Sequence, residues 1–208
     1  MKETLLEKDV GVTFSKDLKF NEHINNVVSK ANQITGIVKR SFDYLDNEMF
    51  LKLYKSIIRP HLEYANVIWH PMYQHQKHKI EAVQRRATRM LSHLKDKTYS
   101  ERLNILKLPS IKYRQLRGDL IQTYKIINNI ENLNCSDFFN VRDSNTRNSH
   151  LKLYKEFTKT LARTNFLPNR INTVWNSLST NTKSSININQ FKNRVDLELT
   201  SLHYDFYN

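Results

Sequence analysis

Apolar side chains recur at the three- and four-residue steps of a helix through most of this 208-residue sequence. That period predicts helices with one buried face each. The stripes occupy, in order, residues 24–38, 50–69, 80–94, 113–127, 171–178 and 188–195. A β-prone run, VGVTF at 10–14, precedes them and predicts one short strand. The sequence therefore predicts a mainly α-helical fold that begins with a strand.

Residues that favour helix ends mark the boundaries of these elements. Asn21 is the expected cap of the first helix, the second begins near Asp46, and Ser110 caps the fourth. Between residues 135 and 165 the periodicity weakens, and a basic β-hairpin fits that stretch as well as a loop does. The best candidate for a domain boundary is the weakly patterned stretch 130–150.

A proline interrupts the second stripe. Pro60 lacks the amide hydrogen that a helix interior uses, and its ring crowds the preceding turn. We expect the helix, which continues to about Trp69, to bend at this point. Its first half would pack on the first helix while Tyr64 and Trp69 turn toward the third, and water or a side chain would meet the carbonyl freed near Ser56.

The charge of the sequence indicates a class of partner. Lysine and arginine outnumber aspartate and glutamate by 33 to 20, which gives a net charge of +13. A polyanion, and nucleic acid first of all, is the natural ligand of such a chain. One cysteine, Cys135, can form neither an internal disulfide nor a cysteine zinc site, and no apolar run is long enough to span a membrane. We therefore expect an intracellular protein without a membrane partner.

Catalytic motifs are absent from the sequence. It contains no paired-aspartate motif, no HExxH, no serine elbow, and no glycine-rich phosphate loop, since only three glycines occur. His70, His75 and His78 lie close together, but their spacing lacks the ligands of a zinc site, so we read them as a solvated helix junction. Four scattered carboxylates are expected to pair with bases: Glu63, Glu81, Asp96 and Glu101. No catalytic residue, metal, cofactor or small-molecule substrate is predicted.

Two basic rows are the best candidates for binding residues. On the third helix Arg85 and Arg89 lie one turn apart, roughly opposite the apolar stripe, and a second basic strip runs from Arg142 to Arg170. Guanidinium groups contact phosphates bidentately, although a charged outer face is also what any soluble helix shows. The predicted nucleic-acid contacts are Lys77, Arg85, Arg86, Arg89, Lys95, Arg147, Lys152, Lys155, Lys159, Arg163 and Arg170. The aromatic residues mostly sit on apolar stripes, so we expect them to pack in the core instead of stacking on bases.

Several stretches, taken in order, carry a resemblance that periodicity alone does not supply. The chain resembles the C-terminal region of reverse transcriptases from non-LTR retrotransposons of the LINE type, jockey-like, just downstream of the polymerase palm. The stretches are DVGVTFSKDLKFNEHI (9–24), LYKSIIRPHLEYANVIWHP (53–71), IEAVQRRATRML (80–91), YSERLNILKLPSIKYRQLRGDL (99–120) and RTNFLPNRINTVWNSL (163–178).

The resemblance implies a part in a larger machine. Residues 1–19 would be an edge strand of the palm, 20–131 a thumb-like helical bundle, and 132–208 a basic hairpin or loop with two helices. Such a thumb grips RNA or DNA, as an RNA–DNA hybrid or duplex, beside the palm and fingers, and would work in the nucleus. The family's magnesium binds the palm's paired aspartates, which this sequence lacks, so we expect no polymerase activity from it alone.

Two other interpretations stay open. The chain could be a relic of a decayed element with no function of its own. It could also be a helical protein-interaction module, with a strand edge near Val10, Val12 and Phe14 that invites self-association.

Overall fold

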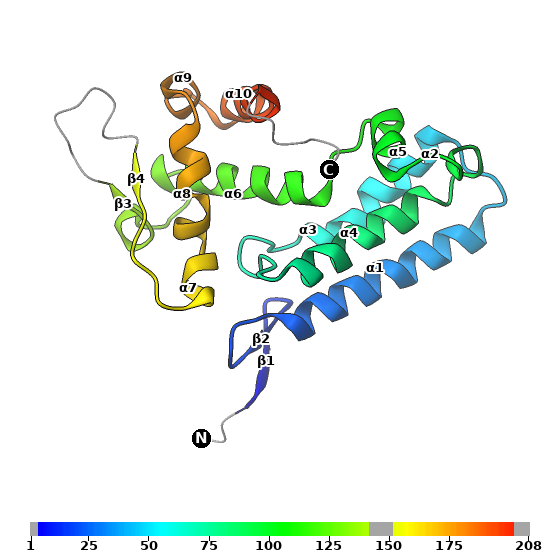
Figure 1. The fold of residues 1–208 in the computed structure, drawn as a ribbon, viewed down its shortest axis with the longest axis horizontal. Coiled ribbons are helices and arrows are strands. Elements are labelled where there is room, and N and C mark those ends of the chain that lie inside the picture. Colours follow the sequence, from blue (N-terminus) through cyan, green and yellow to red (C-terminus); the bar gives the residue numbers. More distant parts are fainter. Residues whose placement is uncertain (1–3, 142–151, 202–208) are drawn as a thin grey trace. The chain divides into compact units, whose positions relative to one another are not determined.

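The computed structural model describes residues 4–141 and 152–201, and its contacts divide them into two units that meet between Arg114 and Gln115. The fold is mainly α-helical, as predicted, and a two-stranded sheet stands before the first helix where one strand was expected (Figure 1). The division lies inside a helix, earlier than the boundary expected after residue 131. It lies there because the rest of that helix packs against the C-terminal helices.

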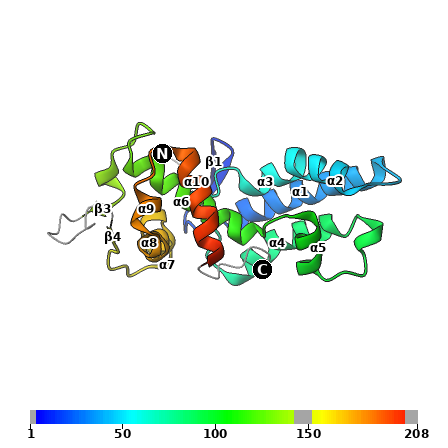
Figure 2. The same cartoon turned by 90° about the horizontal axis from the view of Figure 1, so that it is seen from above.

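The first unit contains two strands followed by helices. Its elements are β1 (Leu6–Asp9), β2 (Val12–Ser15), α1 (Asn21–Ser41), α2 (Asn47–Leu53), the π-helical η1 (Tyr54–Ile58), α3 (Arg59–Glu63), α4 (Gln74–Thr88), the 3-10 turn η2 (Ser92–Leu94), α5 (Tyr99–Leu106) and the start of α6 (Ile111–Ile127). The long α1 packs along α3 and α4 (Figures 1 and 2).

The predicted strand at 10–14 is in fact a turn followed by a strand. β1 pairs antiparallel with β2, and the partners Asp9 and Val12 enclose a two-residue turn. Both turn residues have positive φ, 41° at Val10 and 81° at Gly11, as a type I′ turn requires. Tyr64 donates its hydroxyl to the Val10 carbonyl at 3.0 Å, and a Cβ at Gly11 would lie 3.3 Å from the Tyr64 ring. Glycine is therefore needed at position 11.

A histidine of α1 covers the outer edge of β2. The Thr13 amide donates to His23 Nδ1 at 3.2 Å, and the His23 ring meets the ring of Trp69 edge-on at 5.1 Å. Only 4% of His23 is exposed, and burial, followed by the charge of Lys8, lowers its pKa. The imidazole must be neutral to accept from Thr13, since both nitrogens of the charged ring carry protons.

The predicted bend at Pro60 is a π-helical turn. The Arg59 amide reaches five residues back to the Tyr54 carbonyl, and Pro60 then falls in the first turn of α3, where its missing amide hydrogen is not needed. The helix ends at Glu63 and does not reach Trp69, because the chain turns through a left-handed residue, Ala65, with φ 53°. The Tyr64 hydroxyl meets the hairpin turn and Trp69 meets His23, while Trp69 also belongs to the buried cluster that includes Ile80 and Val83 of α4.

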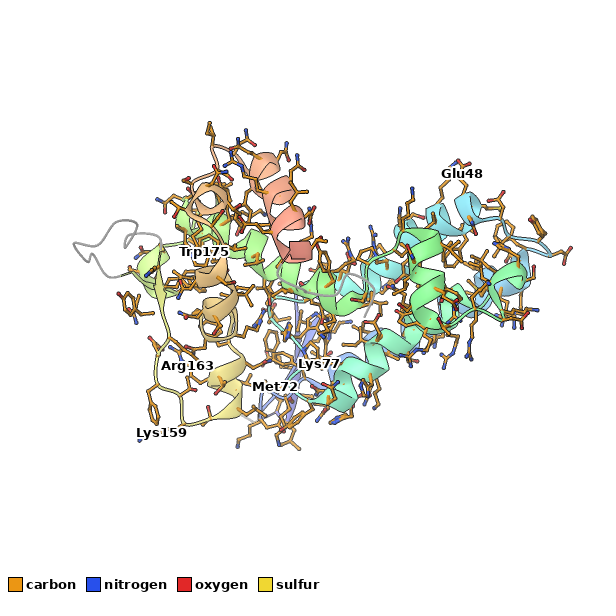
Figure 3. The ribbon with its side chains drawn as sticks, turned by 45° about the horizontal axis from the view of Figure 1, so that its top comes forward. Glu48, Met72, Lys77, Lys159, Arg163 and Trp175 are labelled. Atoms are coloured by element: carbon orange, nitrogen blue, oxygen red, sulfur yellow. The ribbon has the colours of Figure 1, made fainter. Side chains whose placement is uncertain are left out.

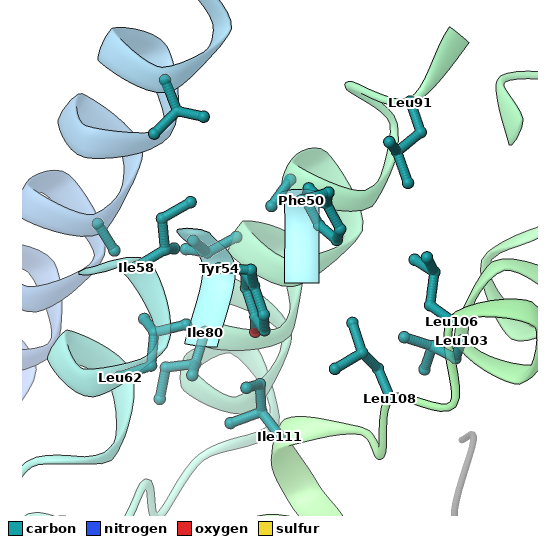
Figure 4. Close-up of a cluster of buried hydrophobic side chains, with 14 of the residues drawn as sticks. Phe50, Tyr54, Ile58, Leu62, Ile80, Leu91, Leu103, Leu106, Leu108 and Ile111 are labelled. Carbon is teal, nitrogen blue, oxygen red and sulfur yellow. The ribbon is translucent and has the colours of Figure 1, made fainter. Parts of the chain in front are cut away.

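The bent helix α2–η1–α3 supplies the centre of the first core. Phe50, Tyr54, Ile58 and Leu62 are fully buried on one face of it, and they meet side chains of α4, α5 and the start of α6 (Figure 4). The Tyr54 hydroxyl donates to Gln84 Oε1 at 2.5 Å, and the Gln84 amide donates to the Pro109 carbonyl at 2.9 Å. This buried chain of hydrogen bonds fixes how α4 lies on the bent helix.

Carboxylates hold helix ends in the same unit. Glu81 of α4 accepts from the amides of Ile111 (3.0 Å) and Lys112 (3.3 Å) at the start of α6, and from the Tyr99 hydroxyl. Glu101 forms a capping box with Thr98. Glu81 and Glu101 thus stabilise helix N-termini instead of pairing with bases as expected, since unpaired amides at a helix start attract negative charge. Of the four carboxylates, Glu63 does form the expected ion pairs, with Arg114 and Arg59.

The second unit continues α6 and adds short elements before two longer helices. They are η3 (Cys135–Asp137), β3 (Asn140–Val141), β4 (Leu153–Tyr154), α7 (Leu161–Asn165), α8 (Leu167–Ser177), α9 (Thr180–Lys183) and α10 (Ile188–Ser201). β3 and β4 pair antiparallel, which confirms the small hairpin. α8 crosses α6 (Figure 1), and Tyr124 of α6 stacks on Phe191 of α10 at 4.2 Å.

The hairpin turn offers a test of backbone strain. A left-handed conformation costs an L-residue about 1–2 kcal/mol, and asparagine tolerates it better than valine. Val10 is 76% exposed, so Val10→Asn loses little packing and should stabilise the chain by about 1 kcal/mol, or about 2–4 °C in melting temperature. Thermal unfolding measures this. Lys8→Asn, in the strand of the same hairpin, is the matched control and should bring no gain.

The buried histidine predicts a dependence of stability on pH. The pKa of His23 is lowered in the folded state from its ordinary value of 6.5, so below pH 6.5 the unfolded chain binds the proton more readily. Stability should be complete above pH 6.5 and fall as the pH drops toward the folded pKa, by up to about 1.4 kcal/mol per pH unit. Urea unfolding between pH 5 and 7.5 measures the slope. His23→Gln should remove this contribution, whereas replacing the exposed His78 should leave it.

Candidate nucleic-acid interface

The C-terminal half of α4 presents arginines to solvent. Its apolar residues Ile80, Val83 and Ala87 are buried, while Arg85, Arg86 and Arg89, here named the α4 arginine face, are exposed on the other side. Lys95, in the turns that follow, is also exposed, and Lys77 is half-buried (Figure 3). Within the part of the chain that the structure describes, no carboxylate lies within ion-pair distance of the three arginines or Lys95.

A buried cation lies close to this face. Arg102 of α5 is 1% exposed, and it donates through Nε to Thr88 Oγ1 at 3.0 Å and through Nη1 to the Lys97 carbonyl at 2.6 Å. Burial lowers the pKa of Arg102, and the charges of Arg89 and Arg85 lower it further. The buried Arg102 guanidinium is therefore repelled by Arg89 and Arg85, and a bound anion would relieve that repulsion.

An aromatic ring lies beside two of these guanidinium groups. The ring of Tyr99 has the Arg85 Cζ 5.0 Å and the Arg102 Cζ 5.7 Å from its centroid. The nearby carboxylate of Glu81 is already occupied by the Tyr99 hydroxyl and the amides of α6. Glu81 thus caps α6, and among residues 4–141 and 152–201 no carboxylate forms an ion pair with the α4 arginine face.

Sequence reasoning did not single out Arg102 or Tyr99. Arg102 sits beside Leu103 on the buried side of a helix, where an arginine is usually read as an exposed, solvated residue. The only available signal was that the short apolar pattern of residues 99–106 leaves Arg102 on its buried side.

The predicted basic strip of the second unit divides into exposed and paired residues. Lys152, Lys155 and Lys159 are exposed. Arg163 pairs with Glu156 at 2.7 Å, and its Cζ lies 5.1 Å from the centroid of the Phe166 ring. Lys159 lies just before α7, and Arg163 lies in α7 itself (Figure 3). Arg142 and Arg147 lie outside the described residues.

Arg170 serves the core of the second unit and should be removed from the predicted binding residues. Its Nε and Nη2 donate to the two carboxylate oxygens of Asp119 at 2.8 and 2.7 Å, and its Nη1 donates to the Asn165 carbonyl at 2.7 Å. The two side chains are 10% and 3% exposed. Burial raises the pKa of Asp119, and the charge of Arg170 opposes that rise. This ion pair fastens α8 to α6.

The histidines predicted as a solvated junction lie at and before the start of α4. His75 stacks on Tyr73 at 5.4 Å, and His78 Nε2 lies 3.0 Å from Gln74 Nε2. Across residues 4–141 and 152–201, no three histidine, cysteine, aspartate or glutamate side chains gather closely enough to hold a metal ion. Over the same residues no helix has the length and apolarity to cross a membrane.

No family model, curated protein sequence or solved structure matches the chain. The case for a function therefore rests on the residues and their geometry. The strongest feature of that geometry in the first unit is the α4 arginine face.

The ion pair between Arg170 and Asp119 offers a test of whether Arg170 is a structural residue. Arg170→Met leaves the Asp119 carboxylate buried without its partner, and such a loss costs about 3–5 kcal/mol. We expect that decrease in the free energy of unfolding by urea. Asp119→Asn combined with Arg170→Met should cost less than the two single changes together. Full additivity would show that the pair is not coupled.

Proposed function

We propose that this chain binds duplex nucleic acid, and that the α4 arginine face contacts the phosphate backbone. The observation that carries the proposal is the contrast among the arginines of the first unit. Arg59 and Arg114 are paired with Glu63, whereas Arg85, Arg86 and Arg89 stand exposed, and no described carboxylate pairs with them. An exposed row of guanidinium forks next to a buried cation suits a ligand with repeated negative charges.

The physical driving force is the release of counterions. Each phosphate that an arginine neutralises frees ions condensed on the duplex, and this term is independent of base sequence. A net charge of +13 adds long-range attraction for the same ligand. A competing explanation is that cations near the C-terminus of α4 only stabilise its dipole, which is worth about 0.3–1 kcal/mol each. That explanation predicts stability effects without binding effects.

The resemblance to non-LTR reverse transcriptases suggests in which kind of enzyme this binding would be used. In the proposal the chain acts as the thumb-like part of an RNA-directed DNA polymerase and holds the RNA–DNA or DNA duplex made there. The paired aspartates and their magnesium belong to the palm, so the chain contributes binding and positioning and does not perform the reaction. Primer extension by this chain alone is accordingly not expected.

The alternative of self-association through the strand edge is less well supported. Because Asp9 and Val12 bound the two-residue turn as a hydrogen-bonded pair, the backbone groups of Leu6 and Lys8 point away from β2. A second copy could pair its own β1 antiparallel with this β1 through those groups. In the two registers that include most of β1, Glu7 lies opposite either Glu7 or Asp9 of the second copy. Like charges directly opposite are destabilising, and charged residues blunt an exposed edge.

A charge-matched pair of variants tests the proposed interface. In Arg85→Gln/Arg86→Gln/Arg89→Gln, three phosphate contacts are lost. The slope of log K against log salt for an RNA–DNA duplex should become shallower by about 2.7, at about 0.9 per contact. Fluorescence anisotropy between about 50 and 200 mM salt, the range of that relation, gives the slope.

The control is Lys30→Gln/Lys39→Gln/Arg40→Gln, which removes three exposed charges of α1. It should change the slope far less. If the two triple variants have equal salt slopes, binding depends only on the net charge of the chain, which would contradict an interface on α4. Absence of binding by the unaltered chain at low salt would contradict the proposed function itself.

A further inference from the structure

The segment that follows β4 carries an aromatic ring in solvent. Phe157 is 89% exposed and is flanked at two-residue spacing by the exposed Lys155 and Lys159. Within the described residues no other ring and no guanidinium lies against it, whereas Phe166 nearby has Phe138 at 6.3 Å and Arg163 over its face. Burial of a phenylalanine is strongly favourable, so this exposure needs a reason.

The segment around this ring is held by hydrogen bonds to other residues of the same unit. Leu153 exchanges hydrogen bonds with the Asn176 side chain of α8, with its amide donating at 3.0 Å and its carbonyl accepting at 2.8 Å. Glu156 accepts from Arg163 at 2.7 Å and from Asn140 at 3.1 Å. The Thr158 hydroxyl lies 2.7 Å from that of Thr164. Glu156 and Thr158 are therefore held by partners in the same unit.

Lys155, Phe157 and Lys159 are all exposed, and they occupy every second position of an irregular segment that bends at Lys159. A cation, an aromatic ring and a second cation thus follow one another within five residues. This order matches a polynucleotide strand, in which bases and phosphates alternate in reach of a protein surface.

We propose that the row Lys155, Phe157 and Lys159 binds single-stranded nucleic acid, with a base stacked on Phe157 and flanking phosphates at the two lysines. The proposal rests on the proposed function and extends it to a second substrate class. A duplex keeps its bases stacked on one another, so it offers phosphates to the lysines but no free base face to the ring. The α4 arginine face and this row would therefore prefer different forms of nucleic acid.

The first test removes the ring from the full chain. Phe157→Ala should weaken binding of a fluorescent twelve-nucleotide single-stranded RNA by about fivefold to about 150-fold, the range for one lost base stack. Duplex affinity should change less than twofold. Phe157→Trp should preserve binding to the single strand, and Phe157→Leu should behave like alanine, since leucine is apolar but has no π face.

A matched control and a charge variant separate stacking from other effects. Ile186 is likewise 89% exposed in the same unit, so Ile186→Ala removes a similar exposed apolar side chain and should leave both affinities unchanged. Lys155→Gln/Lys159→Gln should weaken binding to the single strand and make its salt slope shallower by about 1.4, at about 0.7 per contact.

Four results would overturn the inference, and the last of them would remove the proposed function as well. If Phe157→Ala keeps its single-strand affinity while Lys155→Gln/Lys159→Gln loses affinity, no base stacks on Phe157, and the proposed function still stands. An equal loss for duplex would show that the ring does not select a free base. If Phe157→Ala loses binding to anionic vesicles but keeps its affinity for the single strand, the row binds a lipid surface instead. Failure of the unaltered chain to bind any nucleic acid would instead remove both proposals.

Discussion

The first unit depends on the burial of one face of the bent helix α2–η1–α3. Four fully buried side chains, Phe50, Tyr54, Ile58 and Leu62, meet the apolar side of α4, and the hydrogen bond from Tyr54 to Gln84 fixes how the two helices lie on each other. Once that side of α4 is buried, helical geometry leaves Arg85, Arg86 and Arg89 on its solvent side. The π-helical turn before Pro60 is part of this arrangement, because it lets one helix carry the proline and still bury residues on both sides of it.

Most helix positions could be predicted from the sequence because they depend on residues near one another, although Asn21 proved to be the first residue of α1 and not its cap, which is Phe20. Asp46 caps α2 through the Met49 amide, and Ser110 accepts from the Tyr113 amide at the start of α6, as their residue types indicate. The end of the second helix could not be predicted, since the apolar stripe continues to Trp69. Ala65 is held in a left-handed turn while Trp69 packs on His23, a contact between residues far apart in the sequence.

The roles of the arginines show the same limit. Arg170 and Arg85 look alike in a sequence, yet one is buried against Asp119 and the other is exposed over Tyr99. What separates them is the position of carboxylates tens of residues away, which only the tertiary structure gives. The role of Phe157 could not be predicted from the sequence either. An aromatic residue is usually assumed to be buried, and only the tertiary structure gives the 89% exposure of Phe157.

Arginine modification by phenylglyoxal, mapped residue by residue by mass spectrometry, tests the central claim most directly. In the free chain the exposed Arg85, Arg86, Arg89 and Arg40 should react, and the buried Arg102 and Arg170 should not. Saturation with an RNA–DNA duplex should protect Arg85, Arg86 and Arg89 and leave Arg40 reactive. If the three α4 arginines stay as reactive as in the free chain while the duplex is bound, nucleic acid binds elsewhere and the account is contradicted.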